Sequence, residues 1–173
     1  MSNSKKRINY IISAALIAAF YAALTFFGNI FGLSYGPIQL RFSEVLTVLP
    51  LFTPAAIPGL TIGCCIANIA SFNILDVVFG SLATLVAACL TYILKDIRFK
   101  GIPLLALLPP VVVNALVIGL EISLFLAPKF HFYGFLIAAL QVGIGQFIVC
   151  YCFGIPFYLI VDKNKGKRNL TKK

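Results

Sequence analysis

Apolar residues run along this chain in long blocks, and short stretches rich in polar and basic residues separate them. The blocks do not alternate as a half-buried strand does, and most approach the ~20 residues that a helix needs to cross a bilayer. The pattern therefore predicts an all-α integral membrane protein, a bundle of six transmembrane helices. The predicted spans are residues 9–28, 40–52, 55–71, 77–94, 102–127 and 133–161.

The uninterrupted apolar block over residues 42–71 allows either one span or two. As one helix it would be ~45 Å long, whereas the hydrocarbon core of a bilayer is ~30 Å thick. Pro50, Pro54 and Pro58 lie in its middle, and a proline inside a helix removes a hydrogen-bond donor and bends or breaks the helix. We therefore predict two spans with a tight connection, the first of them short.

Composition supports a membrane environment. The chain is 61% hydrophobic and 11% charged, whereas about 25% charged residues is usual for a soluble domain. A water-soluble globular protein is excluded, because its polar groups could not cover its surface. A formal net charge of +9 can indicate nucleic-acid binding when the basic residues gather on one face. Here they stand between and beyond the apolar blocks, so nucleic-acid binding is not indicated.

The basic residues also predict the orientation of the bundle. With six spans and a cytoplasmic N-terminus, every Lys and Arg except Arg41 and Lys129 lies on the cytoplasmic side, as the positive-inside rule requires. Five spans would instead place the 95–100 loop and the basic tail 162–173 outside. We therefore expect a single membrane domain over residues 1–173, with both termini in the cytoplasm.

Acids and amides inside the predicted spans are costly, since a charge at a helix centre costs ~2.5–3.5 kcal/mol on insertion scales. Asn114 and Glu121 are two helical turns apart and share a face. Gln141 and Gln146 point ~140° apart on their helix. We favour Gln141 as the amide that lies with Asn114 and Glu121. We expect a pocket open to the external side, suited to a small, flat solute with hydrogen-bond donors to offer. The predicted lining is Glu44, Asn68, Asp76, Asn114, Glu121, Gln141 and Gln146.

Most of these polar residues also admit a purely structural interpretation. Glu44 could simply pair with Arg41, three residues before it. Asp76 could only cap a helix, and the amides could only join helices by hydrogen bonds. Glu121 is the hardest to explain in this way, because no basic residue lies within two turns of it on its own helix. A binding role is therefore best supported for Glu121.

The first predicted span carries a candidate surface for docking a partner helix. Small residues spaced four apart let another helix approach closely, and this span has two such rows side by side. Packing inside the bundle would use small residues equally well, but two parallel rows make an unusually wide strip. The two rows are Ala14, Ala18 and Ala22, and Ala15, Ala19 and Ala23.

The sequence lacks the common motifs of catalysis. It contains no GxxxxGK[ST] loop for ATP, no HExxH and no GxSxG, and it has one His in all. Its five Cys lie in apolar blocks without metal-ligand spacing, and we interpret them as small buried hydrophobes. We therefore expect a transport subunit that is not an enzyme, needs no cofactor or metal, and takes its energy from partner subunits.

Four segments together resemble a known family. They are LRFSEVLTVLPLFTPAAIPGLTIGCCIANI, DVVFGSLATLVAA, LPPVVVNALVIGLEI and VGIGQ. This set resembles the queuosine-precursor transporter (QueT) family, the substrate-binding S components of energy-coupling factor (ECF) importers. The resemblance covers about residues 13–161, nearly the whole chain.

The resemblance implies a six-helix subunit of the bacterial cell membrane. It implies capture of a queuosine precursor from outside, a 7-deazaguanine base such as 7-aminomethyl-7-deazaguanine. Transport would need a transmembrane coupling (T) protein, which the alanine rows would contact, and two cytoplasmic ATPase subunits. The whole S component would topple to bring its ligand to the cytoplasm.

The chemistry of such a ligand agrees with the predicted pocket. A deazaguanine edge presents adjacent N–H donors to a carboxylate, and an aminomethyl group adds a cation for a second acid. We assign Glu44 and Glu121 to these roles, with Asn68, Asn114 and Gln141 reading the remaining edge. Relatives often carry an acid where this chain has Gln146, which leaves open whether it prefers the amine, the nitrile or free queuine.

Two other functions remain open at this point. A stand-alone secondary carrier or channel for a small polar solute would also lack an ATPase motif. An S component for a different vitamin-like substrate would share the same architecture. A third interpretation, a structural membrane subunit without a ligand, requires the polar residues to be packing contacts only.

Overall fold

The computed structural model describes residues 3–32, 40–69, 74–126 and 131–170, with side chains as far as residue 164. Helices make up nearly all of these ranges, and no strand forms within them. The elements are α1 (Asn3–Ile30), η1 (Phe42–Leu51), α2 (Ala56–Ile69), η2 (Asp76–Gly80), α3 (Ser81–Ile93), η3 (Leu94–Asp96), η4 (Leu104–Leu107), α4 (Leu108–Glu121), η5 (Ile122–Leu126), α5 (Phe132–Phe147), η6 (Ile148–Phe153) and α6 (Gly154–Leu170).

In the described part of the chain, four helical stretches are long and apolar enough to cross a membrane. They are Asn3–Ile30, Asp76–Asp96, Leu104–Phe125 and Phe132–Asn164. Two shorter apolar helices, Phe42–Leu51 and Ala56–Ile69, occupy the second and third predicted spans. At ~2.0 Å per residue for a 3₁₀ helix and ~1.5 Å for an α-helix, each is only ~20 Å long. The chain is therefore an all-helical, multi-pass membrane protein in which two segments are shorter than a bilayer core.

The break predicted inside the apolar block of residues 42–71 is confirmed. η1 ends at Leu51 and α2 begins at Ala56. Pro58 falls in the first turn of α2, where a missing N–H costs nothing. The predicted span ends at residues 71 and 127 lie outside the described residues, as does Lys129.

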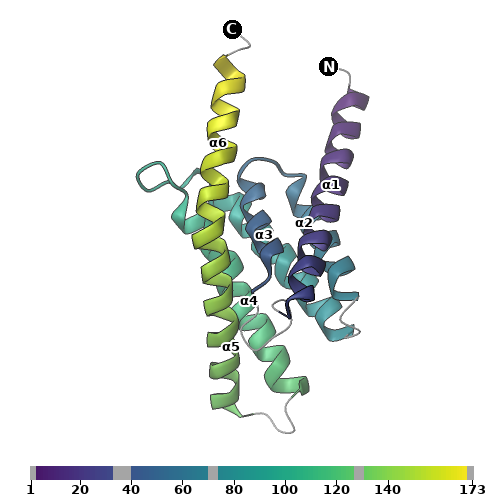
Figure 1. Ribbon diagram of the computed structural model, residues 1–173, viewed down its shortest axis with the longest axis vertical. Helices are drawn as coiled ribbons and strands as arrows, with labels where there is room; N and C mark the ends of the chain where they lie inside the picture. Colours follow the sequence, from purple (N-terminus) through teal and green to yellow (C-terminus); the bar gives the residue numbers. More distant parts are fainter. Residues whose placement is uncertain (1–2, 33–39, 70–73, 127–130, 171–173) are drawn as a thin grey trace.

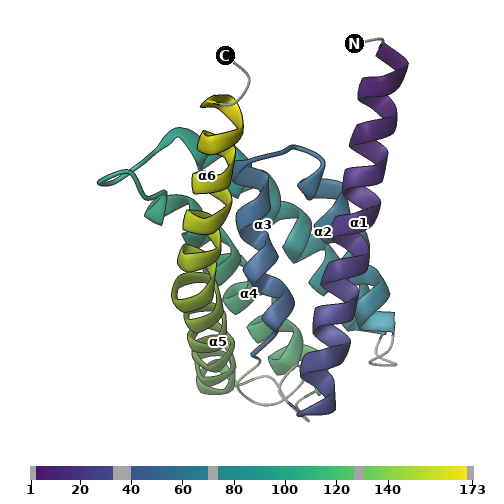
Figure 2. The ribbon, with the colours of Figure 1, turned by 45° about the horizontal axis from the view of Figure 1, so that its top comes forward.

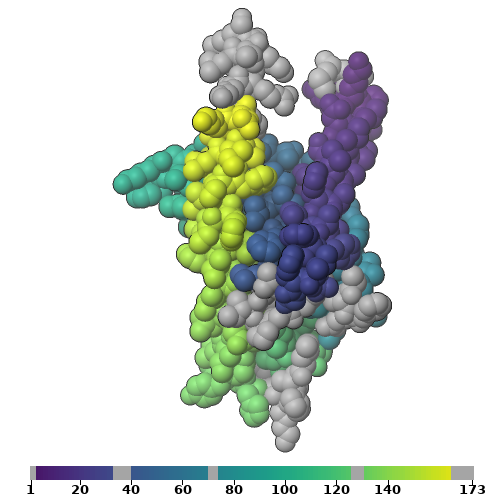
Figure 3. Space-filling view, viewed as in Figure 1, coloured from purple at the N-terminus to yellow at the C-terminus, as the bar shows by residue number. Residues whose placement is uncertain are grey.

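The start of α1, the connection between α3 and α4, and the end of α6 lie at the same end of the bundle (Figure 1). The view in Figure 2 shows the same arrangement, and in Figure 3 α1 and α6 project past the rest of the bundle at that end. The connection contains a tight turn in which Phe99 and Ile102 exchange backbone hydrogen bonds of 2.9 and 3.0 Å. We call this end, which carries the basic residues 5–7 and 95–100, the basic end.

The backbones of α1 and α2 touch at two glycines of α2. A Cβ added to Gly59 would lie 2.8 Å from the carbonyl oxygen of Ala14, and one added to Gly63 would lie 2.7 Å from Tyr21 Cβ. Only a glycine fits at so close an approach, which is the packing that small residues four apart allow. The core beside this contact is formed by the side chains of Tyr21, Leu46, Ala56, Leu60, Cys64, Ala67 and Ala88.

Three wide helical turns interrupt the α-helices. η2, η5 and η6 are π-helical, and η5 and η6 directly follow Glu121 and Phe147. Such turns are rare and often occur at functional sites. Each of them begins at or within two residues of a predicted pocket residue, namely Asp76, Glu121 or Gln146.

Candidate solute-binding site

Buried and half-buried polar side chains from six helical elements and one connecting residue meet inside the bundle. Each lies close to another member, and the surrounding helices are apolar. We call this group the polar cluster. Its members are Tyr21, Arg41, Glu44, Asn68, Asp76, Glu121 and Gln146.

Glu44 lies in the first turn of η1 and is only 2% exposed. The hydroxyl of Tyr21 on α1 donates a hydrogen bond to its Oε1. The Gln146 amide lies beside the same carboxyl, and the Arg41 guanidinium is close enough to attract it. Glu44 is thus held by a neutral donor and by a nearby cation, and the pairing with Arg41 that the sequence left open is only part of its environment.

Gln146 is positioned by groups on its own helix and on η1. The thiol of Cys150, one turn later, donates to Gln146 Oε1 at 3.7 Å, and it lies 3.7 Å from the hydroxyl of Thr47. Both Gln146 and Cys150 are buried. The structure therefore places Gln146 beside Glu44. The preference for Gln141 as the amide that joins Asn114 and Glu121 stays a prediction.

Asn68 joins α2 to η2. Its Nδ2 donates to the backbone carbonyl oxygen of Asp76 at 2.8 Å and contacts Cys64 Sγ at 3.4 Å. A Cβ on Gly80 would lie 2.6 Å from this Nδ2, so the glycine makes room for the amide. Asn68 therefore makes a hydrogen bond between helices, one of the two roles that the sequence left open for it.

Asp76 and Glu121 bring two carboxyl groups together from η2 and α4. They lie within hydrogen-bonding range of each other, and Arg41 is within electrostatic range of Glu121. Glu121 is 2% exposed, and neither of its oxygens accepts a hydrogen bond from an N–H or O–H of the described residues. Asp76 lies inside a helical turn with its side chain toward Glu121, so helix capping does not describe its position.

The other two predicted residues lie outside these contacts. Asn114 is buried on α4, two turns before Glu121 as expected. Gln141 lies on α5 and lines a separate cavity of about 270 Å³, close to the lower end of the ~300–1,000 Å³ usual for small-molecule pockets. The lining residues are Ile122, Ser123, His131, Gly134, Ile137, Ala138 and Gln141.

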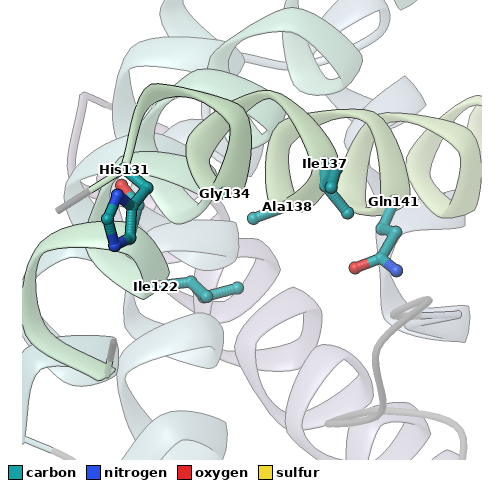
Figure 4. A pocket seen from close by; sticks show the side chains of 7 residues that line it. Ile122, His131, Gly134, Ile137, Ala138 and Gln141 are labelled. Atoms are coloured by element: carbon teal, nitrogen blue, oxygen red, sulfur yellow. The ribbon is translucent and has the colours of Figure 1, made fainter. Parts of the chain in front are cut away.

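Figure 4 shows this cavity from close by, with Gln141 and His131 toward its two ends and Ile122 opposite α5. It lies between η5 and the first turns of α5, at the end of the bundle opposite the basic end. The exposed His131 contributes a polar group to the cavity wall. The cavity begins at Ile122, immediately after the buried Glu121.

The alanine strip of α1 is divided between two environments. Ala18 and Ala22 are buried and Ala14 is half-buried, and the backbones of Ala14 and Ala18 touch the glycines of α2. The second row faces outward, with all its members exposed. That row consists of Ala15, Ala19 and Ala23.

Sequence reasoning missed Tyr21 and the position of Arg41 within electrostatic range of Glu121. Tyr21 stands three residues after Ala18 and one before Ala22, on the face of α1 that packs against α2. A tyrosine in the middle of a span usually needs a partner for its hydroxyl, and this signal would have identified it. Among the described residues, no group of three His, Cys, Asp or Glu side chains is arranged to hold a metal ion.

Comparison with known proteins places the chain in one family. The family model described as QueT transporter matches residues 11–163. The curated protein "Queuosine precursor transporter QueT" of Lactococcus lactis subsp. cremoris (strain MG1363) is 44% identical over 97 residues. That alignment covers 56% of this chain and 57% of the relative, so the chain spans just over half of the relative's length. No solved structure matches the chain significantly.

Proposed function

This chain belongs to the QueT transporter family, and from this premise we propose that it is the substrate-binding S component of an ECF-type importer. It captures a queuosine precursor, a 7-deazaguanine base such as 7-aminomethyl-7-deazaguanine, from outside the bacterial cell. It delivers the base inward together with a transmembrane coupling (T) protein and two ATPase subunits. A toppling movement of the whole subunit carries the bound base across.

The observation that supports this proposal most is the polar cluster. Two buried acids, two buried amides and the half-buried Asp76 lie among apolar helices, where each unpaired charge is expensive and where ionisable groups mark the paths of solutes. The edge of a 7-deazaguanine offers adjacent N–H donors, which carboxylate and amide oxygens accept. A chain that only needed to pack its helices would gain more from apolar residues at these positions.

The proposed topology has six membrane crossings, both termini in the cytoplasm and one membrane domain over residues 1–173. The basic end gathers residues 5–7 and 95–100, which the positive-inside rule places in the cytoplasm. The short segments η1 and α2 make the second and third crossings, and residues 52–55 connect them. The cavity at Gln141 then opens toward the external side.

Within this topology we assign the ligand to the polar cluster and the neighbouring amides. Glu44 and Glu121 are the acceptors for the ring N–H donors and for a cationic substituent. The other residues complete the contacts around the base and at its entrance from the external cavity. They are Asn68, Asp76, Asn114, Gln141 and Gln146.

The T protein docks on the exposed row of α1, which is Ala15, Ala19 and Ala23. Their small side chains let a partner helix approach the backbone closely, and nothing in the described part of the chain covers them. Ala14, Ala18 and Ala22 support this face from behind by holding α1 against α2.

Calorimetry on the solubilised protein with guanine, queuine and the aminomethyl and cyano bases tests the binding role. A 7-deazaguanine base should bind, and guanine should bind more weakly or not at all. Absence of binding by every deazaguanine base would refute the proposal.

Intramembrane acids also occur in ion-coupled carriers, so reconstitution must separate the two functions. An S component transports only with its T protein and ATPases. A carrier would transport alone in vesicles with an ion gradient, and uptake under that condition would favour the carrier.

A further inference from the structure

We propose that Asp76 and Glu121 form a subsite for an ammonium group, so that the chain selects a cationic aminomethyl base over neutral bases of the same shape. This inference rests on the proposed function and divides the two acceptor roles that it leaves together. Glu44 reads the ring N–H donors, and the Asp76–Glu121 pair holds the cation.

The two carboxyls differ from Glu44 in what surrounds them. Glu44 already accepts the Tyr21 hydroxyl and has the Gln146 amide beside it. Glu121 is only 2% exposed and faces the carboxyl of Asp76. Neither Glu121 oxygen accepts a hydrogen bond from an N–H or O–H of the described residues. A buried carboxyl that faces another acid and has no donor must either hold a proton or pair with a cation, and a cationic ligand supplies the second arrangement.

The charged groups around the pair also favour binding of a cation. Among the described residues, the charged groups that act on Glu121 are Asp76 and Arg41, and Arg41 also acts on Glu44. Three acids and one guanidinium leave an excess of negative charge. Because Arg41 attracts both Glu44 and Glu121, it cannot neutralise all three acids. One added positive charge would bring the group closer to balance.

A primary ammonium fits this arrangement better than other cations of similar size. It carries three N–H donors and no acceptor, so it can donate to both carboxyls and still reach a third oxygen. A neutral hydroxymethyl or cyano group supplies at most one donor and no charge. Such a ligand would leave two acids facing each other, and the site would bind it weakly.

The test compares two bases that differ in one group. Calorimetry measures the affinity of the solubilised protein for 7-aminomethyl-7-deazaguanine and for 7-hydroxymethyl-7-deazaguanine. The unmodified chain should bind the amine roughly 100-fold more tightly, in the range measured for close buried charge pairs. D76N and E121Q should each reduce this ratio to roughly 10-fold or less. D96N removes an exposed acid at the basic end of the bundle and should leave the ratio unchanged.

The outcomes separate the inference from the proposed function. Equal affinity of the unmodified chain for the two bases would overturn the ammonium subsite, while binding itself would still support an S component. A ratio unchanged in both D76N and E121Q would also overturn it. If one variant fails to fold, the other variant and the unmodified chain still decide the result. Binding of neither base would overturn the proposed function.

Discussion

Gly63→Ala should loosen the contact between α1 and α2 that supports the polar cluster. The added methyl carbon would lie 2.7 Å from Tyr21 Cβ and 2.8 Å from the carbonyl oxygen of Ala18. Both atoms belong to or adjoin the backbone of α1, so no flexible side-chain end can move out of the way. The two helices must therefore separate.

The loss of folding free energy follows from the size of this overlap. Ordinary carbon contacts lie at ~3.5–4.0 Å, so the helices must move apart by about 1 Å. Overpacking of this kind destabilises the fold by ~1–3 kcal/mol, whereas alanine in place of a helical glycine stabilises the helix by ~0.5–1 kcal/mol. The net loss is about 1–2 kcal/mol, which lowers the unfolding midpoint by about 2–8 °C in a chain of this size.

Thermal unfolding followed with a thiol-reactive dye measures this loss as the rise above the baseline set by the exposed Cys152, because the buried Cys64 and Cys150 react only when the bundle opens. Gly154→Ala is the matched control. Its added carbon would meet its nearest heavy atoms at 3.7 Å, an ordinary contact, so the midpoint should stay or rise slightly. If Gly63→Ala raised the midpoint as much as the control does, α1 and α2 could not be in backbone contact.

Four further substitutions test the cluster and the docking face. Ala18→Leu should lower the unfolding midpoint, because Ala18 is buried, whereas Ala19→Leu should keep stability and ligand affinity but abolish T-protein association and uptake. Unchanged uptake in the second variant would place the docking face elsewhere. Tyr21→Phe removes the donor to Glu44 and should cost ~1–3 kcal/mol in thermal stability; an unchanged midpoint would contradict that bond. Gln146→Ala should weaken calorimetric binding of the aminomethyl base by roughly 10-fold, and normal affinity would exclude this amide from the ligand.

Much of the helical framework was predictable, because block length and proline are local signals. The break between η1 and α2 follows from prolines that cannot continue a helix, and the structure confirms it. The 3₁₀ form of η1 and the π turns at Asp76 and after Glu121 were not predicted. They depend on contacts with neighbouring helices, which periodicity in one segment does not contain.

The candidate site shows the same limit. Counting residues along α4 correctly put Asn114 and Glu121 on one face, since the helical repeat is a property of a single helix. Counting along α5 separated Gln141 from Gln146 but could not decide which of them faces Glu44. That choice depends on how far each helix is rotated about its own axis, and only the packing of neighbouring helices sets that rotation.

By itself, the sequence determined that this is a helical membrane protein, which residues are costly to bury, and the family to which it belongs. Hydrophobicity, proline and charge act locally, so they can be read along the chain. The tertiary structure decided that Tyr21 bonds Glu44, that Asp76 faces Glu121, and which alanine row is exposed. These facts join segments far apart in the chain, and they follow from how close-packed helix surfaces fit together.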